Sequence, residues 1–63
     1  MVIGEKYLIN CYGFNYVVIV TEIKSGDVCG HYSTDKGKNF TKYPGGFEFT
    51  QIESISPMWD EID

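Results

Sequence analysis

The sequence predicts an all-β domain, a small barrel of about five strands with one long hairpin at its centre. Residues 15–34 read NYVVIVTEIKSGDVCGHYST, two runs rich in Val, Ile, Thr and Tyr that flank the turn signal Ser25-Gly26. A further alternating run, FEFT, follows at residues 47–50. No stretch of the chain has the periodicity and length of an amphipathic helix.

Local patterns predict the remaining elements. Residues 5–12 form a first strand, which ends in a turn near Gly13 and Asn15. Residues 16–23 form the second strand, the longest of the sheet. Residues 35–46, DKGKNFTKYPGG, predict a loop that is long for so small a domain. Residues 51–55 predict either a short helical turn or a brief fifth strand, which Pro57 ends.

The hairpin turn sets a register and therefore a core face. A two-residue loop at Ser25-Gly26 places Ile23 opposite Val28 and Ile19 opposite Tyr32. The expected core face consists of Val17, Ile19, Ile23, Val28 and Tyr32, with Ile19 at its centre. The expected outer face consists of Val18, Val20, Glu22, Cys29, His31 and Ser33. Gly30, in the middle of a strand, indicates a bend or bulge.

The composition defines one domain, residues 1–63, with the barrel at about 4–55 and an acidic tail at 56–63. The 63 residues are 43% hydrophobic, too apolar for a disordered chain. There is no apolar run that would span a membrane and no secretory signal at Met1, so we expect a cytoplasmic protein. The net charge is -4, and the five basic residues are all lysines. This balance argues against nucleic acid as the main partner.

The reactive side chains do not form a catalytic or metal-binding pattern. His31 is the only histidine, and its nearest predicted partner is Cys29, two residues away on the same strand. Only the Cys29-x-His31 spacing is short enough for a zinc site, and the carboxylates show no calcium-loop motif. We therefore expect no enzyme, no metal and no cofactor. Cys11 and Cys29 are expected as reduced thiols, with a disulfide between them as the alternative.

Two segments carry the predicted binding residues. The loop contains Lys36, Lys38, Phe40, Lys42 and Tyr43, a mixture of cations and rings that suits single-stranded nucleic acid, although a loop covering a barrel end has the same composition. In the tail, Trp59 is followed by Asp60 and Glu61. Trp59 either plugs an open end of the barrel or anchors a partner, while the acids steer toward a basic surface.

The aromatic residues exceed what this core can bury. We assign Phe47, Phe49 and Tyr32 to the core. The residues left over are Tyr7, Tyr12, Phe14, Tyr16, Tyr43 and Trp59. Surface aromatics are typical of protein interfaces. A more specific hypothesis is that several of these rings form an aromatic cage for a cationic ligand.

The order of these elements resembles that of the Src-homology-3-like small barrels, a group that includes Tudor, Sm and KOW domains. The resemblance spans residues 4–55 and rests on GEKYLI, YVVIVTEIKSGDV and GFEFTQIESI. It implies a binding module. The sequence thus predicts a non-enzymatic, acidic module that binds a larger protein, similar in type to bacteriophage accessory or inhibitor proteins. The alternatives are a nucleic-acid-binding barrel that uses the 36–43 loop and, as a further partner, a second copy of the chain.

Overall fold

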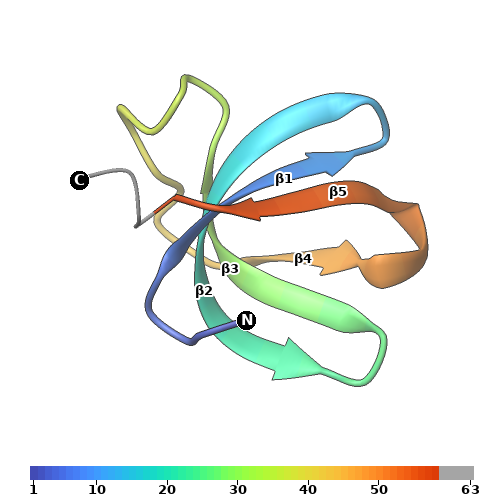
Figure 1. Cartoon of the computed structure of the whole chain (residues 1–63). Coiled ribbons are helices and arrows are strands. Elements are labelled where there is room, and N and C mark those ends of the chain that lie inside the picture. Colours follow the sequence, from blue (N-terminus) through green and yellow to red (C-terminus); the bar gives the residue numbers. More distant parts are fainter. Residues whose placement is uncertain (59–63) are drawn as a thin grey trace.

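The computed structural model describes residues 1–58 and consists almost wholly of antiparallel strands (Figure 1). The elements are β1 (Lys6–Cys11), β2 (Phe14–Lys24), β3 (Asp27–Ser33), β4 (Gly45–Glu48), the 3₁₀ turn η1 (Phe49–Gln51) and β5 (Ile52–Pro57). The predicted all-β class is confirmed. Residues 51–55 hold both of the expected alternatives, because the chain leaves η1 and enters β5 within that stretch. Among residues 1–58, no helix has the length and apolar character needed to cross a membrane.

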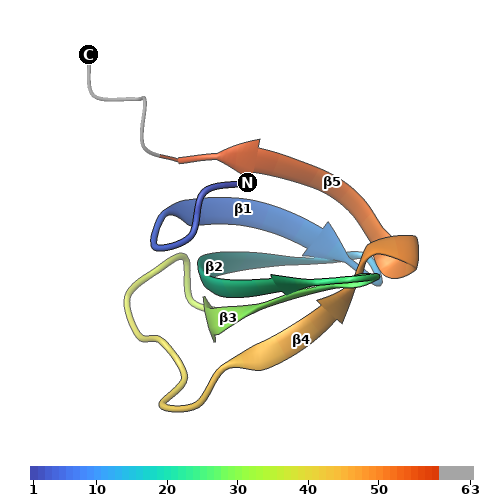
Figure 2. The same cartoon turned by 90° about the horizontal axis from the view of Figure 1, so that it is seen from below.

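The five strands form one strongly curved sheet in the order β4-β3-β2-β1-β5. The sequence predicts a closed barrel, but in residues 1–58 the edge strands β4 and β5 do not pair with each other. Figure 2 shows why: β4 and β5 meet where η1 joins them and diverge away from this turn. β4 is only four residues long, so it pairs with β3 over Asp27–Gly30 and reaches no further.

A bulge in β2 changes the predicted register. Lys24 faces Asp27 and Ile23 faces Val28, as the turn predicts, but the pairing shifts between Val20 and Glu22. The extra residue, Thr21, lies beside Gly30. A side-chain carbon on Gly30 would stand 2.2 Å from the carbonyl oxygen of Ile19. Gly30 therefore marks an irregularity, as expected, but the inserted residue lies on the partner strand.

One inserted residue reverses the alternation of side chains, so every side chain beyond the bulge lies on the opposite face from the one predicted. Val18 and Val20 are fully buried in the core, whereas Ile19 is only partly buried and Ile23 is 42% exposed. The predicted face is therefore wrong for Val18, Ile19 and Val20, whereas Ile23 shares the core face of its partner Val28, as predicted, but is not buried there. On the predicted outer face, Val18 and Val20 would have formed an apolar surface for a second copy of the chain, but neither side chain reaches the surface.

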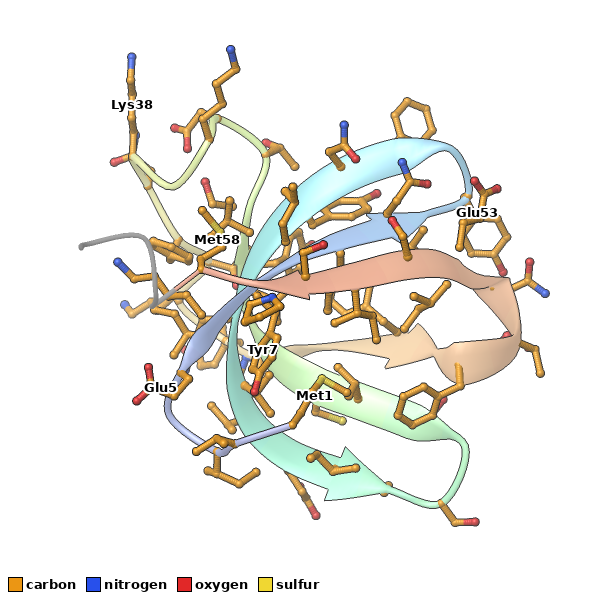
Figure 3. The ribbon with its side chains drawn as sticks, in the orientation of Figure 1. Met1, Glu5, Tyr7, Lys38, Glu53 and Met58 are labelled. Carbon is orange, nitrogen blue, oxygen red and sulfur yellow. The ribbon has the colours of Figure 1, made fainter. Side chains whose placement is uncertain are left out.

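The main core fills the concave side of the sheet. Its buried members are Tyr7, Ile9, Cys11, Val18, Val20, Val28 and Phe47, and Tyr16, Tyr32, Ile52 and Ile55 pack against them. Two aromatic assignments need correction. Tyr7 belongs to the core and its hydroxyl accepts a hydrogen bond from the N–H of Val2 at 2.6 Å, whereas Phe49 is 37% exposed. Figure 3 shows Tyr7 beside the N-terminal segment that carries Met1.

Residues 34–44 cover part of the convex side. Val17 and Ser33, at opposite positions on β2 and β3, are 4% and 2% exposed. A side-chain carbon on Gly37 would lie 3.8 Å from a methyl group of Val17, so the loop passes directly above this pair. The expected core residue Val17 is thus buried, but on the opposite side from the main core.

The burial of the two isoleucines predicts different losses of stability when each is replaced by alanine. Ile9→Ala should lower the free energy of unfolding by about 2–5 kcal/mol, because it empties a fully buried site. Ile19→Ala should cost about 1 kcal/mol or less, because this side chain is only partly buried. Urea denaturation of the two variants measures both values. Equal losses would contradict the face assignment of β2.

Candidate functional site

A pocket of about 480 Å³ lies between the turn that joins β1 to β2 and the edge strand β4. The residues that line it are Cys11, Tyr12, Tyr16, Tyr32, Gly45, Gly46, Phe47 and Glu48. The curvature of the sheet brings these residues together from four strands and one turn. Half of them are aromatic, which gives the pocket an apolar wall with one carboxylate at its margin.

Three rings form this wall. Tyr32 and Phe47 meet edge to face, with ring centroids 5.5 Å apart, and Tyr16 packs on both, at 5.7 Å from Tyr32 and 5.2 Å from Phe47. Such spacings are the favoured geometry for aromatic pairs. The rings therefore hold one another in place and present a preformed surface to the pocket.

Gly45 allows the wall to pack this closely. A side-chain carbon at Gly45 would stand 2.7 Å from the Tyr32 ring, so the ring lies directly against the β4 backbone. A side-chain carbon at Gly46 would meet nothing within 4 Å. The two neighbouring glycines therefore do different things: Gly45 accommodates a ring, and Gly46 leaves the strand surface open.

Tyr12 lies at the pocket in a strained conformation. Cys11 pairs with Phe14, so Tyr12 and Gly13 form a two-residue turn, with φ of 55° and 80°. Turns with positive φ at both positions favour Asn, Asp or Gly, and for other residues the left-handed region costs about 1–2 kcal/mol. The Tyr12 side chain is nevertheless 65% exposed and gains little from burial. Strain held without a packing benefit is typical of functional sites.

The pocket is electrostatically negative. Burial raises the pKa of the Cys11 thiol, and the carboxylates of Glu48 and Glu53 raise it further. Cys11 is therefore a protonated thiol at neutral pH and a poor nucleophile. None of the described lining residues is basic. Figure 3 shows Glu53 at the pocket end of the sheet and Lys38 at the opposite end.

The predicted loop residues lie away from this pocket. Lys36, Lys38, Lys42 and Tyr43 are exposed, and Tyr43 is 75% exposed. Phe40 is partly buried, and the Nζ of Lys6 lies 5.9 Å from its ring centroid, a cation–π contact. Of the two loop rings, Tyr43 is thus open to solvent and Phe40 is partly covered. Trp59, Asp60 and Glu61 lie outside the described residues.

Asp35 orders the first half of the loop. Its carboxylate accepts hydrogen bonds from the Ser33 hydroxyl and from the backbone N–H groups of Lys38 and Asn39, at 3.1 and 2.9 Å. These bonds, above all that from Ser33, hold the pKa of Asp35 far below its usual range. The backbone N–H of Gly37 donates a further hydrogen bond to the Ser33 hydroxyl oxygen at 3.0 Å.

Thr41 fixes the second half of the loop to β3. Its N–H donates to the carbonyl of Tyr32 at 2.9 Å, and its hydroxyl accepts the Tyr32 N–H at 3.2 Å. The Nδ1–H of His31 donates to the Thr41 carbonyl at 2.8 Å, which defines the tautomer of that ring. His31 thus has a structural partner, on the face opposite Cys11.

The described part of the chain brings together no three His, Cys, Asp or Glu side chains that could hold a metal ion. Cys11 and Cys29 are both free thiols. Sequence reasoning missed the pocket because its parts meet only through the curvature of the sheet. One local signal was present: a tyrosine before Gly13, in a two-residue turn that favours asparagine. Comparison of the chain with protein-family models, curated proteins and solved structures found no match.

The packing of Tyr32 on Gly45 predicts unequal effects of two alanine substitutions. Gly45→Ala should displace the ring and destabilise the protein by about 1–3 kcal/mol, because it overpacks the wall. Gly46→Ala should be nearly neutral, since space is open there. Chemical denaturation and the NMR signals of the Tyr32 ring report the two effects. Unchanged ring signals in Gly45→Ala would contradict this packing.

The hydrogen bonds of Asp35 predict a pH dependence of the loop. Because folding lowers this pKa, the stabilising contribution is present above the unfolded value of about 4 and is lost as the pH falls toward the folded value. Carboxyl NMR should give a midpoint for Asp35 clearly below 4. The amide signals of Lys38 and Asn39 should shift with the same midpoint. In Asp35→Asn this transition should disappear, and a midpoint at or above 4 would contradict the assignment.

Proposed function

We propose that this chain is a non-enzymatic protein-binding module and that it binds a segment of its partner at the aromatic pocket beside β4. The observation that carries this proposal is Tyr12, which is strained, 65% exposed and part of the pocket lining. A turn selected for stability alone would have asparagine or glycine at this position. Tyrosine offers a large rigid surface with little entropy to lose, which suits a binding contact.

The surroundings of Tyr12 support a protein as the partner. Phe14, at the other side of the same turn, is also 65% exposed, so two aromatic side chains project beside the pocket. Interfaces are enriched in exposed aromatics that surround a well-packed centre. The rigid wall of Tyr16, Tyr32 and Phe47 supplies such a centre without prior rearrangement.

The reactive side chains support a binding role over catalysis. Cys11 has a raised pKa, and the His31 ring donates to Thr41 from the other face of the sheet. A nucleophile and a base would need to lie within hydrogen-bond reach of each other. The element order and the curved sheet are also in keeping with the Src-homology-3-like binding modules that the sequence resembles. A module of this size would act by occupying a surface of a larger protein, as accessory and inhibitor proteins do.

Tyr12→Asn separates folding from binding. Asn-Gly is the favoured pair for this turn, so the variant should melt at the same temperature as the original or higher. Peptides selected on the immobilised chain from a random decapeptide library should bind the variant more weakly by about 2 kcal/mol or more. Calorimetry measures the affinity for the peptides, and thermal denaturation measures the stability of the variant.

Tyr43→Asn is the matched control, because Tyr43 is even more exposed than Tyr12, 75% against 65%, but lies in the loop. It should leave peptide affinity unchanged. A library that yields no binding peptide, or peptides that bind both variants equally, would count against the proposed site. Binding of oligo-dT that is lost in Lys38→Gln would instead favour the loop and nucleic acid.

A further inference from the structure

Among the described residues, no strand pairs with the outer edge of β4. β4 is the last strand of the sheet on its side and, within residues 1–58, pairs only with β3. The remaining edge of β3 is already occupied, because Tyr32 exchanges hydrogen bonds with Thr41. An unpaired edge of this kind presents main-chain donors and acceptors in the spacing that an extended peptide needs.

The register identifies which main-chain groups point off this edge. The N–H of Phe49 donates to the carbonyl of Gly26 at 2.9 Å, toward β3. Main-chain groups alternate in direction along an antiparallel strand, so those of Gly45 and Phe47 also point toward β3. The N–H and C=O groups of Gly46 and Glu48 therefore point outward. Both residues line the pocket.

The pocket is suited to a cationic side chain from such a strand. Tyr12, Tyr16 and Tyr32 all line it. Glu48 adds a carboxylate at the edge itself, and no described lining residue is basic. An ammonium or guanidinium group gains from both features, by attraction to a ring face and by charge pairing.

We propose that β4 accepts an extended segment of another protein as an added strand, and that a lysine or arginine of this segment enters the aromatic pocket; this rests on the proposed function above. The added strand bonds to the outward groups of Gly46 and Glu48. Main-chain bonds give affinity, and the pocket selects one side chain.

The test uses the peptides selected from the random decapeptide library on the immobilised chain. Enriched peptides should share one lysine or arginine. Replacing it with norleucine should weaken binding at least tenfold. N-methylation of amides that face β4 should abolish binding, whereas N-methylation of the alternate amides, the matched control, should have little effect. Glu48→Gln should weaken binding of these peptides several-fold.

Amide hydrogen exchange of the complex gives a readout that needs no variant of the protein. Peptide binding should slow exchange at Gly46 and Glu48, while the β3-bonded amides at Gly45 and Phe47 keep their rates. Peptides that lack a basic residue or tolerate N-methylation throughout would overturn the inference; if they still depend on Tyr12, the proposed binding function stands. A library that yields no peptide would overturn both.

Discussion

The close approach of Gly30 to the β2 backbone is the constraint on which the rest of this structure depends. No other residue fits there, since a side-chain carbon would stand 2.2 Å from the Ile19 carbonyl oxygen. The bulge at Thr21 lies beside this contact and turns Val18 and Val20 inward. Bulges also increase the local twist and bend of a strand. The same contact therefore decides both which residues form the core and how strongly the sheet curves.

The curvature in turn creates the pocket. It brings the turn at Tyr12 close to β4, so that residues of four strands, β1 to β4, line one space. Closing the sheet into a barrel would have paired the β4 edge and removed its outward main-chain groups. An open sheet keeps that edge available, at the aggregation risk that free edges carry. The short length of β4 and the acidic Glu48 both limit that risk.

The sequence predicted the first three strands, the hairpin turn and the irregularity near Gly30, because these depend on local patterns. It placed the fourth strand two residues too late, at 47–50, since β4 is Gly45–Glu48 and Phe49 begins η1. It assigned the wrong face to Ile19, because residue types alone do not distinguish a bulged strand from a regular one. The bulge shifts the register by one residue, and this shift moves Ile19 to the other face. The aromatic surplus was correctly recognised, but Tyr7 and Phe49 were exchanged between core and surface. The pocket was beyond reach because Tyr12, Tyr32 and Gly45 are far apart in the chain and meet only in the curved sheet.

The separation of charge between the two ends of the molecule has a consequence for how partners arrive. Figure 3 shows Lys38 at the loop end of the molecule and Glu53 at the pocket end, where the carboxylates of Glu48 and Glu53 both raise the pKa of the Cys11 thiol. The chain as a whole also has a net charge of -4. A basic segment is therefore attracted to the pocket end before any contact forms. Lys38 would repel such a segment from the loop end and so favour the productive encounter without touching the bound partner.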